Sequence, residues 1–240
     1  MNNQRKMKIS LLLLISVILI FSNCEVHEKK GYSPKKEYNL KGPVKEVNIY
    51  MRKVEGENIP VDTTNFLEKE RLTFDQYGNV IEDFRKTKNE NGVEIVYKLI
   101  FSGKGKNRSY DETGSVDGKA TEKAHYEYIW LNDRRYHIVN KAGNGYSLMV
   151  TLDQDYKTIK TQLKQKDVEV ITTWEHVIKN DRVEKLKALT TIINVDTTKN
   201  LNIQVVKAFD QHNNPTLIYT YDNLAEKKPI VVVFKRYRYY

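Results

Sequence analysis

Apolar and polar residues alternate along most of the chain from Val44 onwards. A period of two is typical of β-strands that have one buried and one solvated face. The alternation is clearest in four stretches, whose apolar faces are Val93, Ile95, Tyr97, Leu99 and Phe101; Tyr146, Leu148, Val150 and Leu152; Val168, Val170, Thr172, Trp174 and Ile178; and Ile230, Val232 and Phe234. β-branched residues and 16 tyrosines fill such stretches, and both kinds of residue favour a pleated sheet.

Turn-forming residues separate the predicted strands. Asn132-Asp133, Gly143-Asn144-Gly145 and Asn180-Asp181 each lie between two of them, which is typical of hairpins. We therefore predict one all-β domain over residues 39–240, an antiparallel meander of hairpins that forms a curved sheet or an open barrel or sandwich, with little helix. Glu184 to Leu189 has helical propensity, but it follows a hairpin turn and we expect a strand there.

Four segments repeat one pattern, in which an apolar strand end precedes Asp and a turn leads into the next strand. They are Phe74–Ile81, Tyr110–Val116, Leu152–Ile159 and Phe209–Thr216. Asp can accept hydrogen bonds from the amides ahead of it, and Gly or Asn can adopt the left-handed conformation at low cost. We therefore predict structural turns at Asp75, Gly78, Asp111, Gly114, Asp153, Asp210 and Asn213. Calcium binding is the alternative, but a calcium loop needs several oxygen ligands close together, and each segment supplies only one or two acids.

The first, second and fourth of these segments resemble the tyrosine-aspartate (YD) repeat of the RHS family and of related bacterial surface lipoproteins. Their intervals are too long and uneven for a regular array. The resemblance implies β-hairpins on an exported protein, and no catalytic residue comes with it.

The N-terminus has the pattern of a secretory signal. Met1 to Lys8 carries three cations and no acid, and an apolar run from Ile9 to Phe21 follows. A membrane-spanning helix needs about 20 apolar residues, and polar Ser22 and Asn23 interrupt this run earlier. We predict a cleaved signal peptide over residues 1–23.

The segment Phe21-Ser22-Asn23-Cys24 resembles the lipobox of bacterial lipoproteins, although that motif prefers Leu and Gly or Ala at the positions of Phe21 and Asn23. The resemblance implies that Cys24 receives diacylglycerol and further acyl chains such as palmitate and becomes the mature N-terminus. Cys24 is the single cysteine of the chain, so an intramolecular disulfide is excluded. The alternative is an unmodified cysteine beside an ordinary cleavage site. Because Glu25 is not the Asp that retains some lipoproteins in the inner membrane, we expect an anchor in the outer membrane or at the cell surface.

Residues 24–38 are predicted to form the lipid anchor and a flexible tether. Glu25 to Lys36 has little apolar content and contains the breakers Gly31 and Pro34. Its lysines are able to lie against anionic head groups, but a simple spacer is the preferred interpretation. Loss of the signal would lower the net charge of the chain from +9 to +6.

No constellation of reactive side chains stands out in the sequence. The five histidines show no metal-ligand spacing, although His125 and His137 flank one hairpin, and no activated serine motif is present. Gly103 to Arg108 lacks the spacing of a phosphate-binding loop. Lys235 to Tyr240 mixes cations with aromatic residues, as nucleic-acid surfaces do, but an exported address argues against that partner. We predict no cofactor and no metal.

The final strand also loosely resembles the last strand of outer-membrane barrels. On that arrangement Arg236 and Arg238 would share the lipid face with Tyr240, at a cost of about 2–4 kcal/mol for each cation near the bilayer midplane. A lipid-anchored domain outside the bilayer fits the sequence better.

We therefore expect a non-catalytic, lipid-anchored protein of the cell envelope that binds a protein, glycan or lipid or has a structural role. One alternative is a glycan-active enzyme with a dispersed acid site, for which Glu68/Glu70 and Glu82/Asp83 are conceivable pairs. The other is a periplasmic immunity protein against a toxin. A deep pocket with converging acids would favour the enzyme, and an exposed aromatic patch would favour binding.

Overall fold

The computed structural model describes residues 31–88, 91–143, 145–180 and 182–240. The predicted signal peptide and Cys24 lie outside these ranges. Tyr32–Tyr240 forms one compact unit that is 65% strand and 2% helix. Within the described ranges, no helix is long and apolar enough to cross a membrane.

The described chain begins with one short helix, α2 (Pro34–Glu37), and continues as strands. The strands are β1 (Val44–Lys53), β2 (Glu68–Phe74), β3 (Val80–Lys88), β4 (Glu94–Lys104), β5 (Asn107–Val116), β6 (Lys119–Ala120), β7 (Ala124–Asn132), β8 (Arg135–Asn140), β9 (Ser147–Leu152), β10 (Thr158–Gln165), β11 (Val168–Lys179), β12 (Arg182–Ile193), β13 (Thr197–Phe209), β14 (Pro215–Tyr221) and β15 (Val231–Tyr239). The segment from Glu184 to Leu189 is part of β12, so the prediction of a strand there is confirmed.

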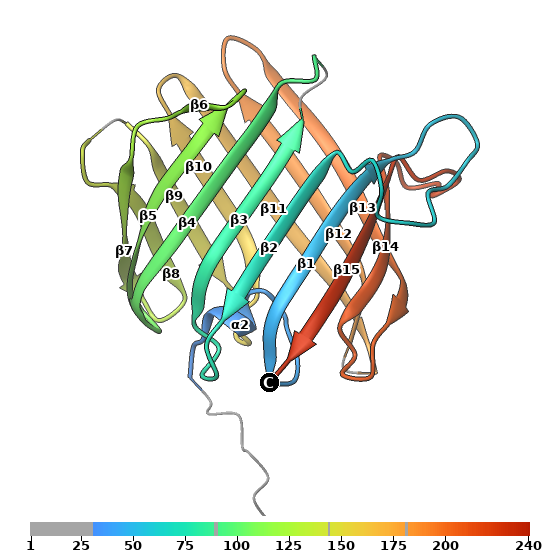
Figure 1. Ribbon diagram of the computed structural model, residues 1–240, viewed down its shortest axis with the longest axis horizontal. Coiled ribbons are helices and arrows are strands. Elements are labelled where there is room, and N and C mark those ends of the chain that lie inside the picture. The colour runs from blue at the N-terminus through green and yellow to red at the C-terminus, as the bar shows by residue number, and fades with distance from the viewer. Residues whose placement is uncertain (1–30, 89–90, 144, 181) are drawn as a thin grey trace, which may run out of the picture. The chain divides into compact units, whose positions relative to one another are not determined.

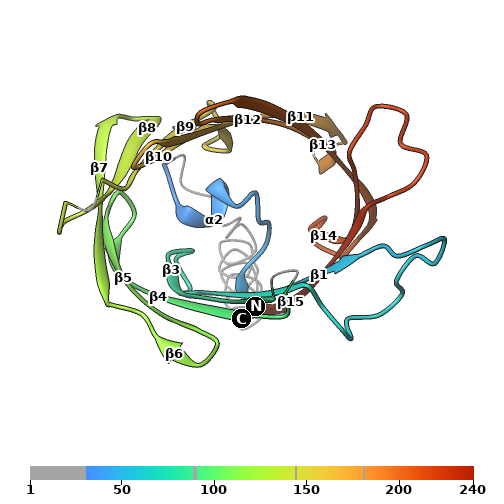
Figure 2. The same ribbon diagram turned by 90° about the horizontal axis from the view of Figure 1, so that it is seen from above.

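The strands form a closed barrel (Figures 1 and 2). Successive strands pair antiparallel, β6 is a short addition at the end of β5, and β1 pairs with β15, so that a meander of 15 strands closes a barrel of 14. The predicted all-β antiparallel meander is therefore confirmed, and the barrel that it forms is closed rather than open. Closure leaves none of the long strands with an unpaired edge.

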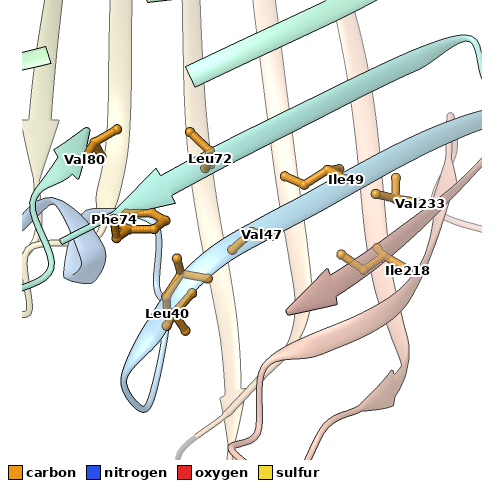
Figure 3. Packing of buried hydrophobic residues seen from close by; sticks show 9 residues of the cluster. Leu40, Val47, Ile49, Leu72, Phe74, Val80, Ile218 and Val233 are labelled. Carbon is orange, nitrogen blue, oxygen red and sulfur yellow. The ribbon is translucent and has the colours of Figure 1, made fainter. Parts of the chain in front are cut away.

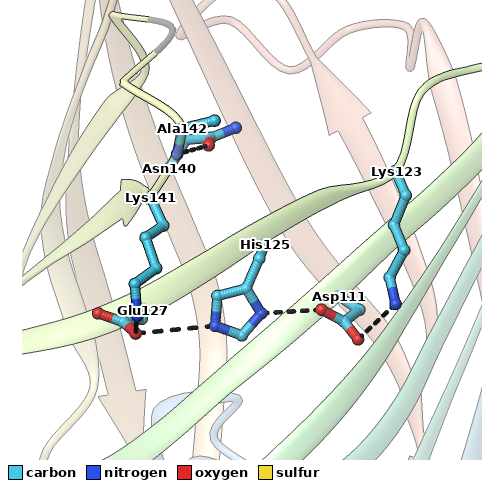
Figure 4. A network of polar contacts seen from close by, with 7 residues as sticks. All are labelled: Asp111, Lys123, His125, Glu127, Asn140, Lys141 and Ala142. Carbon is cyan, nitrogen blue, oxygen red and sulfur yellow. Dashed lines mark hydrogen bonds and ion pairs between the residues drawn. The ribbon is translucent and has the colours of Figure 1, made fainter.

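Charged side chains form a network on part of the outer wall of the barrel, which also carries exposed apolar residues such as Ile100 and Leu189. In Figure 4, His125 on β7 lies between the carboxylates of Asp111 and Glu127, with its Nδ1 2.8 Å from Asp111 Oδ1. Lys123 Nζ lies 2.9 Å from the second oxygen of Asp111, and Lys141 Nζ lies 2.9 Å from Glu127 Oε1. This chain of alternating charge crosses the outside of β5 and β7 and ends at Lys141, just after β8.

Most buried apolar side chains point inward and form two clusters. The first gathers on β1, β2, β14 and β15 (Figure 3), and its members are Leu40, Val44, Val47, Ile49, Leu72, Phe74, Val80, Ile218 and Val233. The second lies on β5, β7, β8 and β9, and its members are Tyr110, Tyr126, Tyr136, Ile138, Val150 and Leu152. Burial of these side chains, at roughly 25 cal/mol per Å² of apolar surface, is the main force that holds the wall together. The predicted inward face of β15 is wrong, because Val233 faces the interior opposite Met51 of β1, and Val232 and Phe234 therefore point outward.

Three of the four repeated segments form the predicted turns. In each, the Oδ1 of Asp accepts hydrogen bonds from the amides two and four residues ahead, at 2.8 to 2.9 Å, for Asp75, Asp153 and Asp210. The residue three positions after the Asp has positive φ, +81° for Gly78 and 62° for Asn213. These turns join β2 to β3, β9 to β10 and β13 to β14, and because strands alternate in direction they lie at the same end of the barrel.

The predicted turn at Asp111 and Gly114 is wrong. Both residues lie inside β5, where Asp111 pairs with Ile100 and Gly114 with Tyr97 of β4. Asp111 belongs to the outer ion pairs and caps no turn. Gly114 allows the backbones of β4 and β5 to lie close together, because a Cβ there would lie 2.6 Å from the carbonyl oxygen of Val96 and 3.3 Å from the ring of Tyr97.

The N-terminal segment from Tyr32 to Leu40, which we name the plug, fills the end of the barrel that carries the three Asp turns. Ser33 caps α2, Pro34 occupies its first turn and is buried, and Figure 2 shows the helix inside the ring of strands. The amide of Lys35 donates to the carbonyl of Gly78 at 3.1 Å. The prediction of a solvated tether through residue 38 is therefore wrong from Tyr32 onwards.

The plug is also held on its C-terminal side. The amide of Lys41 donates to Oδ1 of Asn214 at 2.8 Å, and Nδ2 of Asn214 donates to the carbonyl of Lys41 at 2.9 Å. Asn214 is fully buried and receives its position from the turn at Asp210. The Asp turns thus serve a second purpose, because two of them present the backbone or side-chain groups that bind the plug.

Candidate functional site

The interior of the barrel contains a cavity of about 500 Å³ between the plug and the opposite, open end. Its wall extends from Glu37 of α2 to Gln165, the last residue of β10 before the turn at the open end. The lining is aromatic (Tyr38, Tyr97, Phe101, Tyr110, Tyr126, Tyr128, Tyr136, Tyr146), aliphatic (Leu99, Ile138, Leu148, Val150), charged (Glu37, Asp83, Arg85, Arg108, Glu112) and polar (Thr158, Thr161, Gln165). Tyr97 faces inward and is still 37% exposed, so the cavity communicates with solvent.

Tyrosine rings cover one side of this cavity. Tyr110 and Tyr126 lie opposite each other on β5 and β7 and stack with centroids 4.7 Å apart. Tyr146 meets Tyr126 edge to face at 5.2 Å. Burial and the neighbouring Tyr126 and Glu112 raise the pKa of Tyr146 to about 12, so the rings are neutral under ordinary conditions.

A buried ion cluster lies on the neighbouring strands β2 and β3, where Asp83 shares a cross-strand row with Leu99 and Glu112. Asp83 on β3 accepts from Nη2 of Arg85 at 2.8 Å, and Glu70 on β2 lies 3.2 Å from the same nitrogen. Burial raises the pKa of Glu70 to about 7, against the opposing effect of the Arg85 guanidinium. Lys235 on β15 is buried nearby, which lowers its pKa, and the charge of Glu70 partly compensates. Two carboxyls therefore share the guanidinium of Arg85.

Glu37 fixes the plug to the wall. Its carboxylate accepts hydrogen bonds from the hydroxyls of Tyr32, at 2.6 Å, and of Tyr136. Nη2 of Arg108 lies 3.2 Å from the same carboxylate, and the guanidinium lies 4.0 Å from the centroid of Tyr128. Both charged side chains are largely buried, with 14% of Glu37 and 6% of Arg108 exposed, so each depends on the other.

Glu112 differs from the other acids of the cavity. It lies on the inner face of β5, half-buried, opposite Leu99 of β4 and Ala124 of β7. Burial raises its pKa, while Arg85 opposes the effect. No hydrogen bond or ion pair joins its carboxylate to another residue in the described parts of the chain.

A smaller cavity of about 210 Å³ lies on the other side of the plug. Glu37, Tyr38 and Thr158 line both cavities, so the plug stands between them. His176 lines the smaller one and its Nε2 lies 3.0 Å from the carbonyl oxygen of Thr158, while its buried Nδ1 has no partner among the described residues.

The structure does not bring together most of the residues that the sequence suggested as metal ligands or catalytic acids. Asp75, Asp153 and Asp210 lie at the plugged end in separate turns, and no group of three His, Cys, Asp or Glu suited to a metal ion occurs in the described part of the chain. Glu82 and Asp83 lie on opposite faces of β3: Glu82 pairs with Arg71 and Lys98 outside, and Asp83 lies in the cavity.

Two further pairs raised by the sequence also separate. His125 and His137 are not paired across their hairpin, since His137 pairs with Ile129, four residues beyond His125. Glu68 and Glu70 share the inner face of β2, but among these two only Glu70 reaches the ion cluster with Arg85. The cavity was therefore not predicted from the sequence. A signal for its inner faces was present, because Tyr110 and Glu112, like Tyr126 and Tyr128, are two residues apart in strands.

No family model matches the chain, and neither a curated protein nor a solved structure shows significant similarity to it.

Proposed function

We propose that this protein is a lipid-anchored, non-catalytic binding protein of the cell envelope that holds a small amphipathic molecule inside its barrel. The observation that carries the proposal is the cavity of about 500 Å³ with aromatic walls and a few charged groups. Ligand sites commonly have about 300–1,000 Å³ and combine an apolar lining with few polar groups. Among the three candidate ligand classes, an amphipathic lipid-like molecule fits better than a protein or a long glycan, because the cavity is enclosed by the barrel.

The arrangement of charge supports binding rather than acid catalysis. Asp83 is engaged with Arg85, and Glu37 with Arg108. A glycosidase needs two carboxyl groups that act on one bond, and these two are neutralised by their partners. Glu112 is then the acid of the cavity wall that lacks such a partner among the described residues.

The charged groups on the outer wall support a domain that lies outside the bilayer. The ion pairs around His125 join the outer faces of β5 and β7 (Figure 4), and Arg236 and Arg238 also face outward, toward Thr63 and Glu46. We propose that the membrane connection is made through a lipid on Cys24 after removal of residues 1–23, at the outer membrane or the cell surface.

The test uses three molecules that share one elongated body and differ in the end group: phenylhexylamine, phenylhexanol and phenylhexanoate. Each is titrated by calorimetry into the purified full chain in mild detergent, with detergent-only titrations subtracted. Thr161 lines the cavity, so Thr161→Trp should weaken the binding by about tenfold or more, which corresponds to about 1.4 kcal/mol.

Thr173→Trp is the matched control, because Thr173 is exposed on the outer face of the adjacent strand β11. It should leave the titrations unchanged. The proposal fails if none of the three molecules binds, or if Thr161→Trp and Thr173→Trp have the same effect.

A further inference from the structure

The charges of the large cavity fall into two neutral groups and one remainder. Glu37 is balanced by Arg108. Asp83, the second acid that lines the cavity, is balanced by Arg85 at 2.8 Å. Glu112 is left over, so a ligand that enters from the open end meets a net negative charge.

The surroundings of Glu112 are aromatic. Tyr110 precedes it by two residues on the same face of β5, and Tyr126 stacks on Tyr110 from β7. Tyr146 meets Tyr126 edge to face. Tyr110, Tyr126 and Tyr146 line the same cavity as Glu112. The charge of Glu112 contributes, after burial and the neighbouring tyrosines, to raising the pKa of Tyr110 and Tyr146.

A carboxylate beside several aromatic faces is the arrangement that binds organic cations. The electron-rich faces of tyrosine attract an ammonium group, with about 2 kcal/mol when water is excluded. A carboxylate adds a charge-assisted hydrogen bond. Extending the proposed function, on which this step rests, we infer that the cavity selects amphipathic amines, whose ammonium group lies between Glu112 and the rings of Tyr110, Tyr126 and Tyr146.

Other ligand charges fit this cavity less well. An anion would need Arg85, which is already shared by Asp83 and Glu70, and it would approach Glu112. A metal ion needs several oxygen ligands, and the described residues contain no group of three acidic, histidine or cysteine side chains for it. The aromatic and aliphatic lining suits an ammonium group that carries an apolar chain.

The phenylhexyl series distinguishes these cases in the full chain at neutral pH. Phenylhexylamine should bind about tenfold or more tightly than phenylhexanol and phenylhexanoate. Glu112→Gln should remove this preference, so that the amine binds no more tightly than the alcohol. Glu127→Gln is the matched control, because it removes the same charge from the outer face of β7 and should leave the preference intact.

A second pair of variants tests the rings. Tyr146→Phe keeps the aromatic face and should retain the amine preference, whereas Tyr146→Leu should reduce it several-fold. Thermal melts of each variant establish that the barrel is folded during the titrations.

Each outcome decides between the proposals. If the three molecules bind equally, or the acid binds best, or Glu112→Gln changes nothing, amine selectivity is overturned while the binding function stands. If none of them binds, the binding function itself fails, and amine selectivity fails with it.

Discussion

The bond between the plug and the barrel depends on Glu37, and its removal should be costly. Glu37→Ala leaves the guanidinium of Arg108, 6% exposed, without its carboxylate and leaves the hydroxyls of Tyr32 and Tyr136 without an acceptor. Removing one partner of a buried ion pair costs about 3–5 kcal/mol. In a domain of 150–250 residues each kcal/mol lowers the melting temperature by about 2–4 °C, so a decrease of about 6–20 °C is expected.

The assay is thermal unfolding followed by circular dichroism, with chemical unfolding to obtain the free energy. Glu37→Gln keeps the size and part of the hydrogen bonding, and it should cost about 1–3 kcal/mol. Glu127→Ala removes an exposed ion pair of the outer wall, for which a cost below about 1 kcal/mol is expected. Combining Glu37→Ala with Arg108→Met should cost less than the sum of the single changes. The reasoning is refuted if Glu37→Ala destabilises the protein no more than Glu127→Ala does.

Three further changes test other parts of the structure. Gly78→Val forces a β-branched residue to φ +81° beside Lys35 and should destabilise the protein by on the order of 1–3 kcal/mol. Asp75→Asn keeps the acceptor for the turn amides and should cost less. Calcium should not change the melting temperature of either variant. The pKa of Glu70 is raised to about 7, so between about pH 5 and 7 the folded state holds a proton that the unfolded state releases. The free energy of unfolding, measured relative to Glu70→Gln, should therefore fall as the pH rises from about 5 to 8. A difference that does not change with pH would contradict this. Cys24→Ser should release the protein from membranes in cell fractionation, and a cleaved, exported variant that stays wholly membrane-bound would exclude the anchor.

Alternation along the chain was sufficient to predict the strands, but closure of the barrel was not accessible. Most of the stretch from Val93 to Phe101 lies in β4, and Tyr97, Leu99 and Phe101 of its predicted face point inward. Closure depends on the pairing of β1 with β15, two strands from opposite ends of the sequence. No local signal specifies that register, because it arises from the twist and number of the intervening strands.

The error at Asp111 and Gly114 has a local cause. The segment carries the same letters as the true turns, but Asp117-Gly118 follows it, and both of these residues have positive φ. Asp-Gly is among the strongest hairpin signals. The chain reverses direction at Gly105 and again at Asp117-Gly118. The residues between these two turns are extended and form the ten-residue strand β5.

The plug was missed because its lysines dominate its composition. Ser33 followed by Pro34 is the expected start of a helix, and Tyr32, Tyr38 and Leu40 supply an apolar side.

The candidate site was missed for a different reason. Glu112, Tyr126 and Tyr146 come from β5, from β7 and from the segment just before β9, and only the closed barrel places them around one cavity.

Pairing of the first long strand with the last also governs how the chain folds. The seam of β1 with β15 joins Val44 to Tyr239, so it forms only after nearly the whole sequence is present. Contacts of such long range are slow to form, because the chain loses conformational entropy before the favourable contacts are made. Until then both strands expose unpaired backbone edges that favour association between chains. The yield on refolding from denaturant should therefore fall steeply with protein concentration, even where the closed barrel shows no tendency to associate.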